Sequence, residues 1–212
     1  MLSYVEDNVR LLSRLAALVL ILGLQAGADP LILSPRGTTL TTGQFRLEAA
    51  FSPGNDRGKL FWFATGFQQL EINAIRIDNR IGQDETILGV QWNFLPETML
   101  TPAISFGVRD AAFQSAEGLG VYAAVTRHLP IGEGSRFLKD FEVTAGIGVA
   151  GIRGPVASFE ALTAGNLFAE AEYDSREFNA AVGWQPIPRL RLKLYTVRDE
   201  LYYGAELVPI AF

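Results

Sequence analysis

The chain has 212 residues, no cysteine and a formal net charge of −5, so it is long enough for one domain with a sizeable core. The absence of cysteine excludes disulfides, zinc–thiolate centres, iron–sulfur clusters and a cysteine nucleophile. The acidic balance argues against nucleic acid as a partner, because nucleic-acid binding normally needs a basic patch.

The first predicted element is a secretory signal peptide over residues 1–28. Arg10 and Arg14 precede an apolar run (LAALVLILGL), and an A-x-A cleavage site ends at Ala28. The apolar run is shorter than the roughly 20 residues that a helix needs to span a bilayer. A buried core helix and an uncleaved anchor are the two alternatives. Residues 29–43 are expected to form a periplasmic lead-in to the next element.

From residue 44 onward the chain consists of short runs in which apolar residues alternate with polar or small ones. This alternation is typical of strands with two unlike faces. Turn residues separate the runs, and the links between them are too short for a lid, a plug or an inserted domain. The twelve expected strands are 44–52, 59–67, 70–79, 88–94, 104–109, 119–129, 141–149, 156–163, 166–174, 176–185, 190–195 and 200–212.

Two of these strands depart from simple alternation. In 70–79 the polar face changes parity between Asn73 and Arg76, which predicts a β-bulge. The run 59–67 (KLFWFATGF) is apolar on both faces and is expected to pack partly inward.

An even number of amphipathic strands with short links predicts an all-β fold, a closed antiparallel up-and-down transmembrane β-barrel over residues 44–212. Closure would pair 44–52 with 200–210 and leave no exposed edge. One face of the strands carries bulky apolar residues and the other carries charges mixed with glycine. A soluble sandwich would have to turn those charges to solvent, because unpaired buried charges are costly. An outer-membrane barrel places the apolar face in lipid and the charges in its lumen.

The alternation also predicts which way each side chain faces. The residues expected to face lipid are Phe45, Leu47, Trp92, Phe106, Val143, Ile147, Tyr173, Val182, Trp184, Leu192 and Leu194. The expected lumen-lining residues are Glu48, Gln91, Arg109, Glu142, Glu170, Glu172, Asn179 and Arg191. The wider inward set adds Arg46, Glu71, Asn73, Asn93, Glu160, Lys193 and Glu206.

The inward set contains seven acidic and four basic residues, which leaves an excess of negative charge in a narrow space. If a path through the lumen remains open, this excess predicts a weak preference for cations. A sealed barrel with a structural role is the alternative.

The chain ends LVPIAF, with apolar residues two and four positions before the terminal Phe212. This ending resembles the C-terminal signal that the outer-membrane assembly machinery reads in Gram-negative barrels. The resemblance implies a location in the cell outer membrane, with membrane lipid and that machinery as partners. Glu206 has the same parity as Phe212, so either a bulge near Pro209 separates them or the last turns leave the sheet.

The last third of the chain contains the hairpin pattern EYDSREFNAAVGWQPIPRLRLKLYTVRDELYYGAEL. It has an acidic strand end, an Asn-x-x-x-Gly strand, a proline turn and a leucine-alternating strand. This pattern resembles YjbH-type outer-membrane proteins tied to exopolysaccharide export. The resemblance implies polysaccharide as a partner and assigns no site residue.

The sequence offers no convincing catalytic or metal site, and no cofactor is expected. His128 is the one histidine, and no serine lies in a nucleophile context, so His128 is interpreted as a rim residue. Glu170 and Glu172 share a strand face and resemble an acid–base pair, but charge lining the lumen is the favoured interpretation.

The sequence therefore predicts a non-enzymatic outer-membrane barrel, acting as a narrow pore or as an envelope component linked to exopolysaccharide export. One alternative is a soluble periplasmic barrel that binds an apolar ligand, as lipocalin-like folds do. A barrel hydrolase is the third possibility.

Overall fold

The structure is a computed structural model that describes residues 34–53, 58–78, 84–131 and 135–211. Every regular element in this part of the chain is a β-strand. The twelve strands are β1 (Gln44–Phe51), β2 (Lys59–Phe67), β3 (Leu70–Asp78), β4 (Asp84–Leu95), β5 (Ala103–Arg109), β6 (Gly120–His128), β7 (Leu138–Ala150), β8 (Gly154–Thr163), β9 (Leu167–Tyr173), β10 (Phe178–Ile187), β11 (Leu190–Val197) and β12 (Glu200–Ala211). The expected signal peptide, residues 1–28, lies outside the described residues. None of the described residues forms a helix long and apolar enough to cross a membrane.

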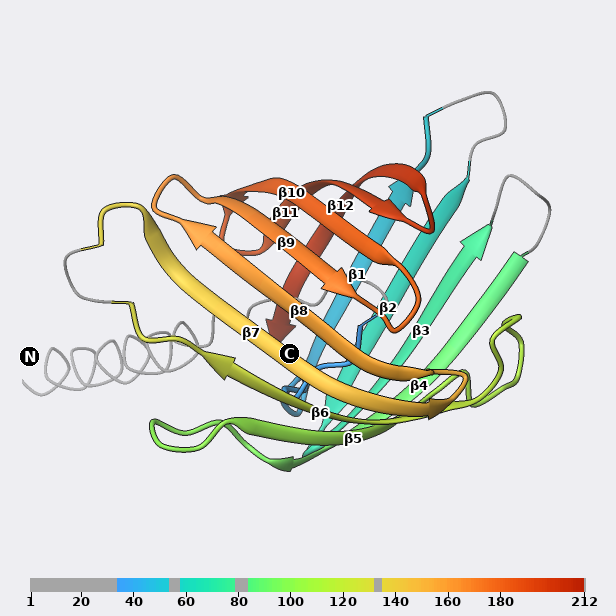
Figure 1. Ribbon diagram of the computed structural model, residues 1–212. Helices are drawn as coiled ribbons and strands as arrows, with labels where there is room; N and C mark the ends of the chain where they lie inside the picture. Colours follow the sequence, from blue (N-terminus) through green and yellow to red (C-terminus); the bar gives the residue numbers. More distant parts are fainter. Residues whose placement is uncertain (1–33, 54–57, 79–83, 132–134, 212) are drawn as a thin grey trace, which may run out of the picture.

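The strands form one closed ring in which each strand pairs with its sequence neighbours (Figure 1). All pairs are antiparallel, and β1 closes the ring by pairing with β12 from Gln44↔Ala211 to Phe51↔Tyr203. The expected closed, twelve-stranded, up-and-down barrel is therefore confirmed. Short links between amphipathic strands favour this topology, because each strand can pair with the next through a hairpin.

The expected bulge in 70–79 is wrong. β3 keeps an unbroken register with both β2 and β4 from Leu70 to Asp78. The parity change arises because the interior is apolar at this end of the strand, where Ile75 and Ile77 are buried. Arg76 lies on the outer face, where it forms ion pairs with Asp78 at 2.9 Å and Asp84 at 3.0 Å.

The two other expected irregularities are confirmed. Leu60 and Trp62 of β2 are buried inside the barrel while Phe61 and Phe63 are exposed, so this strand packs partly inward. In β12 the register against β1 shifts by one residue between Leu207 and Ile210, which places a bulge around Pro209.

The up-and-down topology gives the barrel two rims, which we name by the links that form them. The terminal rim holds the start of β1, the end of β12 and the links at 68–69, 96–102, 129–131 with 135–137, 164–166 and 188–189. The distal rim holds the ends of β1 and β3, the starts of β2 and β4, and the links at 110–119, 151–153, 174–177 and 198–199.

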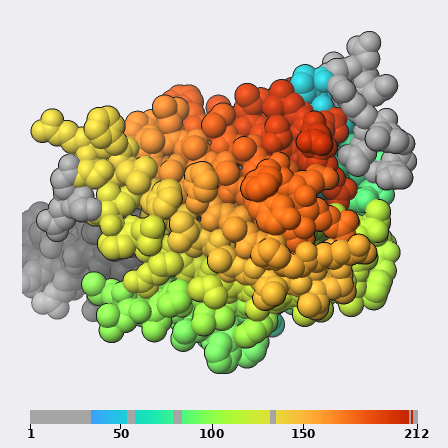
Figure 2. Space-filling model, in the orientation of Figure 1, coloured from blue at the N-terminus to red at the C-terminus, as the bar shows by residue number. Residues whose placement is uncertain are grey.

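Buried and exposed residues alternate along the strands, so the wall has an inner and an outer face. The outer face over β7–β12 is a continuous layer of side chains, coloured yellow to red in Figure 2. Each of the twelve strands carries at least one large exposed apolar residue on this outer face, for example Ile72 of β3 and Leu201 of β12.

Candidate functional site in the barrel interior

The inner wall carries the polar residues that the alternation predicts to face inward. Seven of the eight expected lumen-lining residues are at most 4% exposed: Glu48, Gln91, Glu142, Glu170, Glu172, Asn179 and Arg191. The eighth, Arg109 at the end of β5, has a side chain that is 11% exposed. Of the eleven residues expected to face outward, Phe45, Val143 and Tyr173 are half-buried and the other eight are exposed.

Residues 34–42, which we call the plug segment, run inside the barrel as far as Leu40 and reach the surface at Thr41 and Thr42. The expectation that the chain has no room for a plug is wrong. Ser34, Arg36 and Leu40 are all buried. Contacts of the segment run from β9 at Ser34 to β3 at Leu40, two strands that lie six positions apart in the ring (Figure 1, blue). The plug segment therefore crosses the bore before the chain enters β1.

The inner wall satisfies the backbone of the plug segment through its side chains. Three buried amide groups of the segment donate hydrogen bonds to wall side chains: Ser34 to Glu172 (2.9 Å), Gly37 to Thr126 (2.7 Å) and Leu40 to Glu71 (2.8 Å). Three carbonyl groups accept hydrogen bonds: Arg36 from Gln91 (2.9 Å) and Ser105, Gly37 from Asn93 (2.6 Å), and Thr38 from Gln91 (2.7 Å). Buried backbone groups need such partners, so the interior is built to hold an extended peptide.

Arg36 is the electrostatic anchor of the plug segment. Its guanidinium lies 3.0 Å from Glu142 and 3.3 Å from Glu160. These two glutamates are directly opposite each other on β7 and β8. Like charges in directly opposite positions destabilise a sheet, and Arg36 offsets that repulsion by binding both.

A second arginine repeats this arrangement one strand further along. Glu160 on β8 is directly opposite Glu170 on β9, so Glu142, Glu160 and Glu170 form a row across three strands, which we call the acid row. Arg191 of β11 reaches Glu160 at 2.8 Å and Glu170 at 3.3 Å. Its guanidinium also lies 4.8 Å above the ring of Phe168. The acid row is therefore held by one cation from the plug segment and one from the wall.

The third acidic pair lies at the closure of the ring. Glu48 of β1 and Glu206 of β12 are directly opposite each other. The Lys193 ammonium of β11 lies 3.0 Å from Glu48 and 2.5 Å from Glu206, and all three side chains are almost fully buried. Arg46 adds a longer ion pair to Glu206 at 3.8 Å. Lys193 thus binds both glutamates where the first and last strands pair.

The remaining polar residues of the inner wall are hydrogen-bonded to one another. Asn179 donates to Glu172 at 2.8 Å. The Tyr122 hydroxyl donates to Gln91 at 2.9 Å, and Gln91 in turn donates to the plug segment. These bonds connect the wall side chains into the network that holds the plug segment.

Towards the distal rim the interior becomes apolar. Leu60, Ile77, Ile87, Val197 and Tyr202 belong to one buried cluster, and each lies within a few residues of a distal-rim link. This apolar layer lies between the buried charges of the inner wall and the distal rim. Sequence reasoning anticipated this layer only in the run 59–67, because the interior was otherwise expected to be polar.

At the distal rim, Arg109 binds Glu117 of the β5–β6 link at 3.3 Å. The link starts at Asp110, whose carboxylate accepts hydrogen bonds from Gln114 and Ser115. Burial by itself would raise the pKa of the Asp110 carboxyl, but these bonds outweigh it and hold that pKa below its usual value. The bonds shape the link from within.

His128 lies at the terminal rim, as expected, and has acidic neighbours. Its Nδ1 atom is 2.6 Å from Glu97, and its Nε2 atom is 3.3 Å from Glu142 and 3.7 Å from Asp140. Across the described residues, no three His, Asp or Glu side chains are arranged to hold a metal ion. The contacts of His128 join the β4–β5 link to the start of β7.

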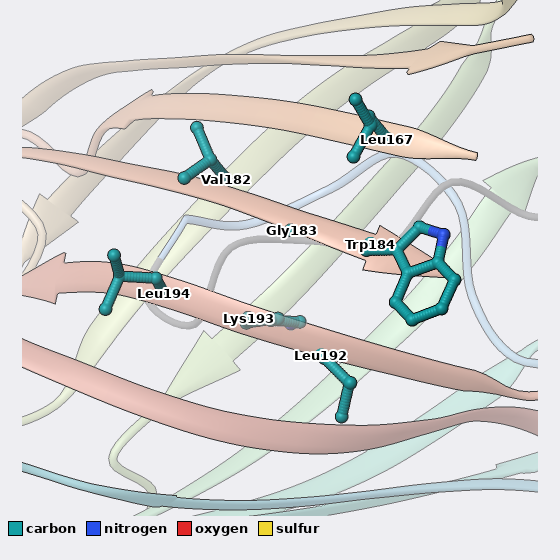
Figure 3. Close-up of a pocket in the computed structure, with 7 residues that line it drawn as sticks. All are labelled: Leu167, Val182, Gly183, Trp184, Leu192, Lys193 and Leu194. Carbon is teal, nitrogen blue, oxygen red and sulfur yellow. The ribbon is translucent and has the colours of Figure 1, made fainter. Parts of the chain in front are cut away.

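The outer face has a shallow apolar groove over β9, β10 and β11 (Figure 3). Leu167, Val182, Trp184, Leu192 and Leu194 line its sides. Lys193 contributes only to the floor of the groove, because its side chain is buried and bound to Glu48 and Glu206. Adjacent residues of β11 therefore serve opposite surfaces, apolar outside and charged inside.

Comparison with known proteins adds no family to this description. No protein-family model matches the chain, and no curated protein matches it.

Proposed function

We propose that the protein is a non-enzymatic integral β-barrel of the outer membrane, with a narrow bore that its own plug segment closes. The observation that carries this proposal is the contrast between the two faces of the wall. The outer face presents large apolar side chains such as Phe63, Trp92 and Ile147 to the surroundings, and the inner face holds buried charges. This is the arrangement that a lipid environment requires.

The distribution of charge on the outer face supports the same proposal. Charged residues that face outward on the described strands occur only near the strand ends. They are Lys59, Arg76, Asp78 and Asp84 near the distal rim, and Arg127 and Lys139 near the terminal rim. An uncharged apolar band lies between them, as the hydrocarbon core of a bilayer demands.

Aromatic residues of the outer face gather at both edges of this band. Near the terminal rim, Trp92 and Phe94 contact each other with ring centroids 5.5 Å apart. Near the distal rim, Phe51 contacts Phe61 at 6.3 Å, and Tyr173 contacts Phe178 at 4.9 Å. Aromatic girdles at the two interfaces are typical of membrane barrels.

The alternative, a soluble lipocalin-like barrel, would need an apolar cavity for its ligand. The plug segment and the acid row occupy the corresponding part of the interior. These features favour the membrane barrel over the soluble one. A role in exopolysaccharide export and recognition of Phe212 by the assembly machinery stay predictions that rest on the sequence patterns.

The proposal is tested by refolding the protein in detergent and mixing it with phospholipid vesicles. We expect the protein to float with the vesicles after a carbonate wash and to migrate faster on a gel before heating than after it. A protein that stays in the soluble fraction without detergent would contradict the proposal and support the lipocalin-like alternative.

Replacing Ile147 by arginine should test the lipid-facing band. We expect the free energy of unfolding in vesicles to fall by about 2–4 kcal/mol, because an arginine at membrane depth is costly. Ile147 and Val149 are both 62% exposed, and Val149 lies closer to the distal rim. Val149→Arg is therefore the matched control and should cost less. On a surface in contact with water, each change would alter the free energy of unfolding by no more than about 0.5 kcal/mol.

A conducting form of the barrel should prefer cations, because acidic residues line the bore. The experiment uses a protein that lacks residues 34–42. In it, we expect the double variant Glu170→Gln/Glu172→Gln to shift the reversal potential toward zero, the value for a channel without ion selectivity. Planar-bilayer recordings in a potassium chloride gradient measure this shift. An anion preference before the change, or an unaltered reversal potential after it, would rule out a cation path lined by these glutamates.

A further inference from the structure

Glu117 of the β5–β6 link is the shared partner of three arginines at the distal rim. Its carboxylate lies 3.3 Å from Arg109, 3.6 Å from Arg176 and 3.4 Å from Arg198. The three arginines come from the end of β5, the β9–β10 link and the β11–β12 link. Three guanidinium groups from separate parts of the ring therefore converge on one carboxylate.

The same contacts carry the β5–β6 link across the mouth of the barrel. Arg198 also binds Glu85 of β4 at 2.7 Å, although β4 lies four positions from β12 in the ring. The amide of Ala116 donates to Glu85 at 3.3 Å, which fixes the link beside β4. The expectation that the links are too short for a lid is thus wrong for 110–119, which reaches across the mouth.

Apart from Glu85, which binds Arg198, two neighbouring acids accept hydrogen bonds from backbone amides. Asp110 accepts hydrogen bonds within its own link, from Gln114 and Ser115. Asp174 accepts from the amides of Arg176 and Glu177 and so shapes the β9–β10 link. Of the carboxylates described at this rim, Glu117 is the one that binds all three arginines.

The cluster is partly open to solvent. The side chains of Arg176, Arg198 and Glu117 are 34%, 20% and 12% exposed. Partly exposed ion pairs contribute little stability, so an external anion can compete for them. The planar guanidinium group binds carboxylate and phosphate through paired hydrogen bonds, which makes both groups suitable competitors.

We propose that Arg109, Arg176 and Arg198 form a binding site for a carboxylate or phosphate group, and that Glu117 occupies this site as an internal ligand. An external acidic group that displaces Glu117 would free the β5–β6 link from its ion pairs with the β9–β10 and β11–β12 links, while the Ala116–Glu85 hydrogen bond would still hold the link beside β4. The site concerns the distal rim alone and does not depend on the membrane in which the barrel resides.

The test is calorimetric titration of refolded protein in detergent with oligogalacturonate, with inorganic phosphate and with neutral maltohexaose. We expect Glu117→Gln to bind oligogalacturonate about tenfold more tightly than the unaltered protein, because the internal competitor is gone. Adding Arg176→Gln to this variant should reverse the gain. Asp84→Asn removes an exposed acid of the same rim and should leave binding unchanged.

The two anions distinguish the source of the acidic group. Phosphate binding without oligogalacturonate binding would identify a site for small free anions, whereas binding of both would extend the site to acidic saccharides. The proposal is overturned if Glu117→Gln does not tighten binding of either anion, if Arg176→Gln leaves the gain intact, or if maltohexaose binds equally well. Heat-modifiable migration of each variant confirms that the barrel is folded.

Discussion

Replacing Lys193 by methionine is expected to lower the free energy of unfolding by about 3–5 kcal/mol. Lys193 is the shared cation of Glu48 and Glu206, which are directly opposite each other at the closure of the ring. Its removal leaves both carboxylates buried without the cation that they share, and the longer ion pair of Glu206 with Arg46 at 3.8 Å does not replace it. Urea unfolding of the refolded protein, followed by tryptophan fluorescence, measures the loss.

The control for this prediction removes the charge on all three residues. The triple variant Lys193→Met/Glu48→Gln/Glu206→Gln should recover most of the lost stability, because neutral replacements leave no uncompensated buried charge. A loss below about 1 kcal/mol in the single variant would contradict the prediction, because Lys193 and its two glutamates would then behave like an exposed ion pair.

Deleting residues 34–42 is expected to convert a barrel that does not conduct into one that conducts ions in planar bilayers. The plug segment crosses the bore and supplies Arg36 to the acid row. Without it, the acidic wall is open to water and to cations. A synthetic peptide with the sequence of residues 34–43 should close the truncated barrel again.

Arg36→Gln provides a milder test of the same idea. It keeps the plug segment but removes its ion pairs to Glu142 and Glu160, so we expect intermittent rather than continuous conduction. Arg189→Gln removes an exposed arginine at the terminal rim and is the matched control. If the truncated protein folds and remains silent, the plug segment does not close the bore.

The fold could be predicted because alternation is a local property of the sequence. Each strand shows its two faces within its own residues, and short links leave few topologies other than a ring of hairpins. The error at β3 came from assuming that the interior is polar throughout. Ile75 and Ile77 belong to an apolar layer near the distal rim, and the sequence of one strand cannot reveal what it meets across the bore.

The plug segment could not be predicted in the same way. An extended segment of nine residues reaches about 30 Å, so a plug needs neither a long loop nor a regular pattern. One signal was present: the expected inward set had seven acids and four bases, and Arg36 is the one charged residue in 34–43. An acidic interior calls for a cation from another part of the chain, and Arg36 supplies it.

The β5–β6 link was missed for a related reason. Its position depends on arginines from three separate parts of the chain, Arg109, Arg176 and Arg198, and no local pattern connects them. Links were judged by length alone, which does not indicate how far a side chain such as Arg198 can reach across a narrow mouth.

The central claim, that the outer face lies in lipid, is tested most directly by lipid-borne quenching of single labelled cysteines. The chain has no cysteine of its own, so each variant carries one label. Ala157 and Phe159 of β8 are exposed on the outer face, and Ser158 between them faces inward. In vesicles containing nitroxide-labelled phospholipid, labels at 157 and 159 should be strongly quenched and the label at 158 weakly. Equal quenching at the three positions, or quenching at none, would contradict the account.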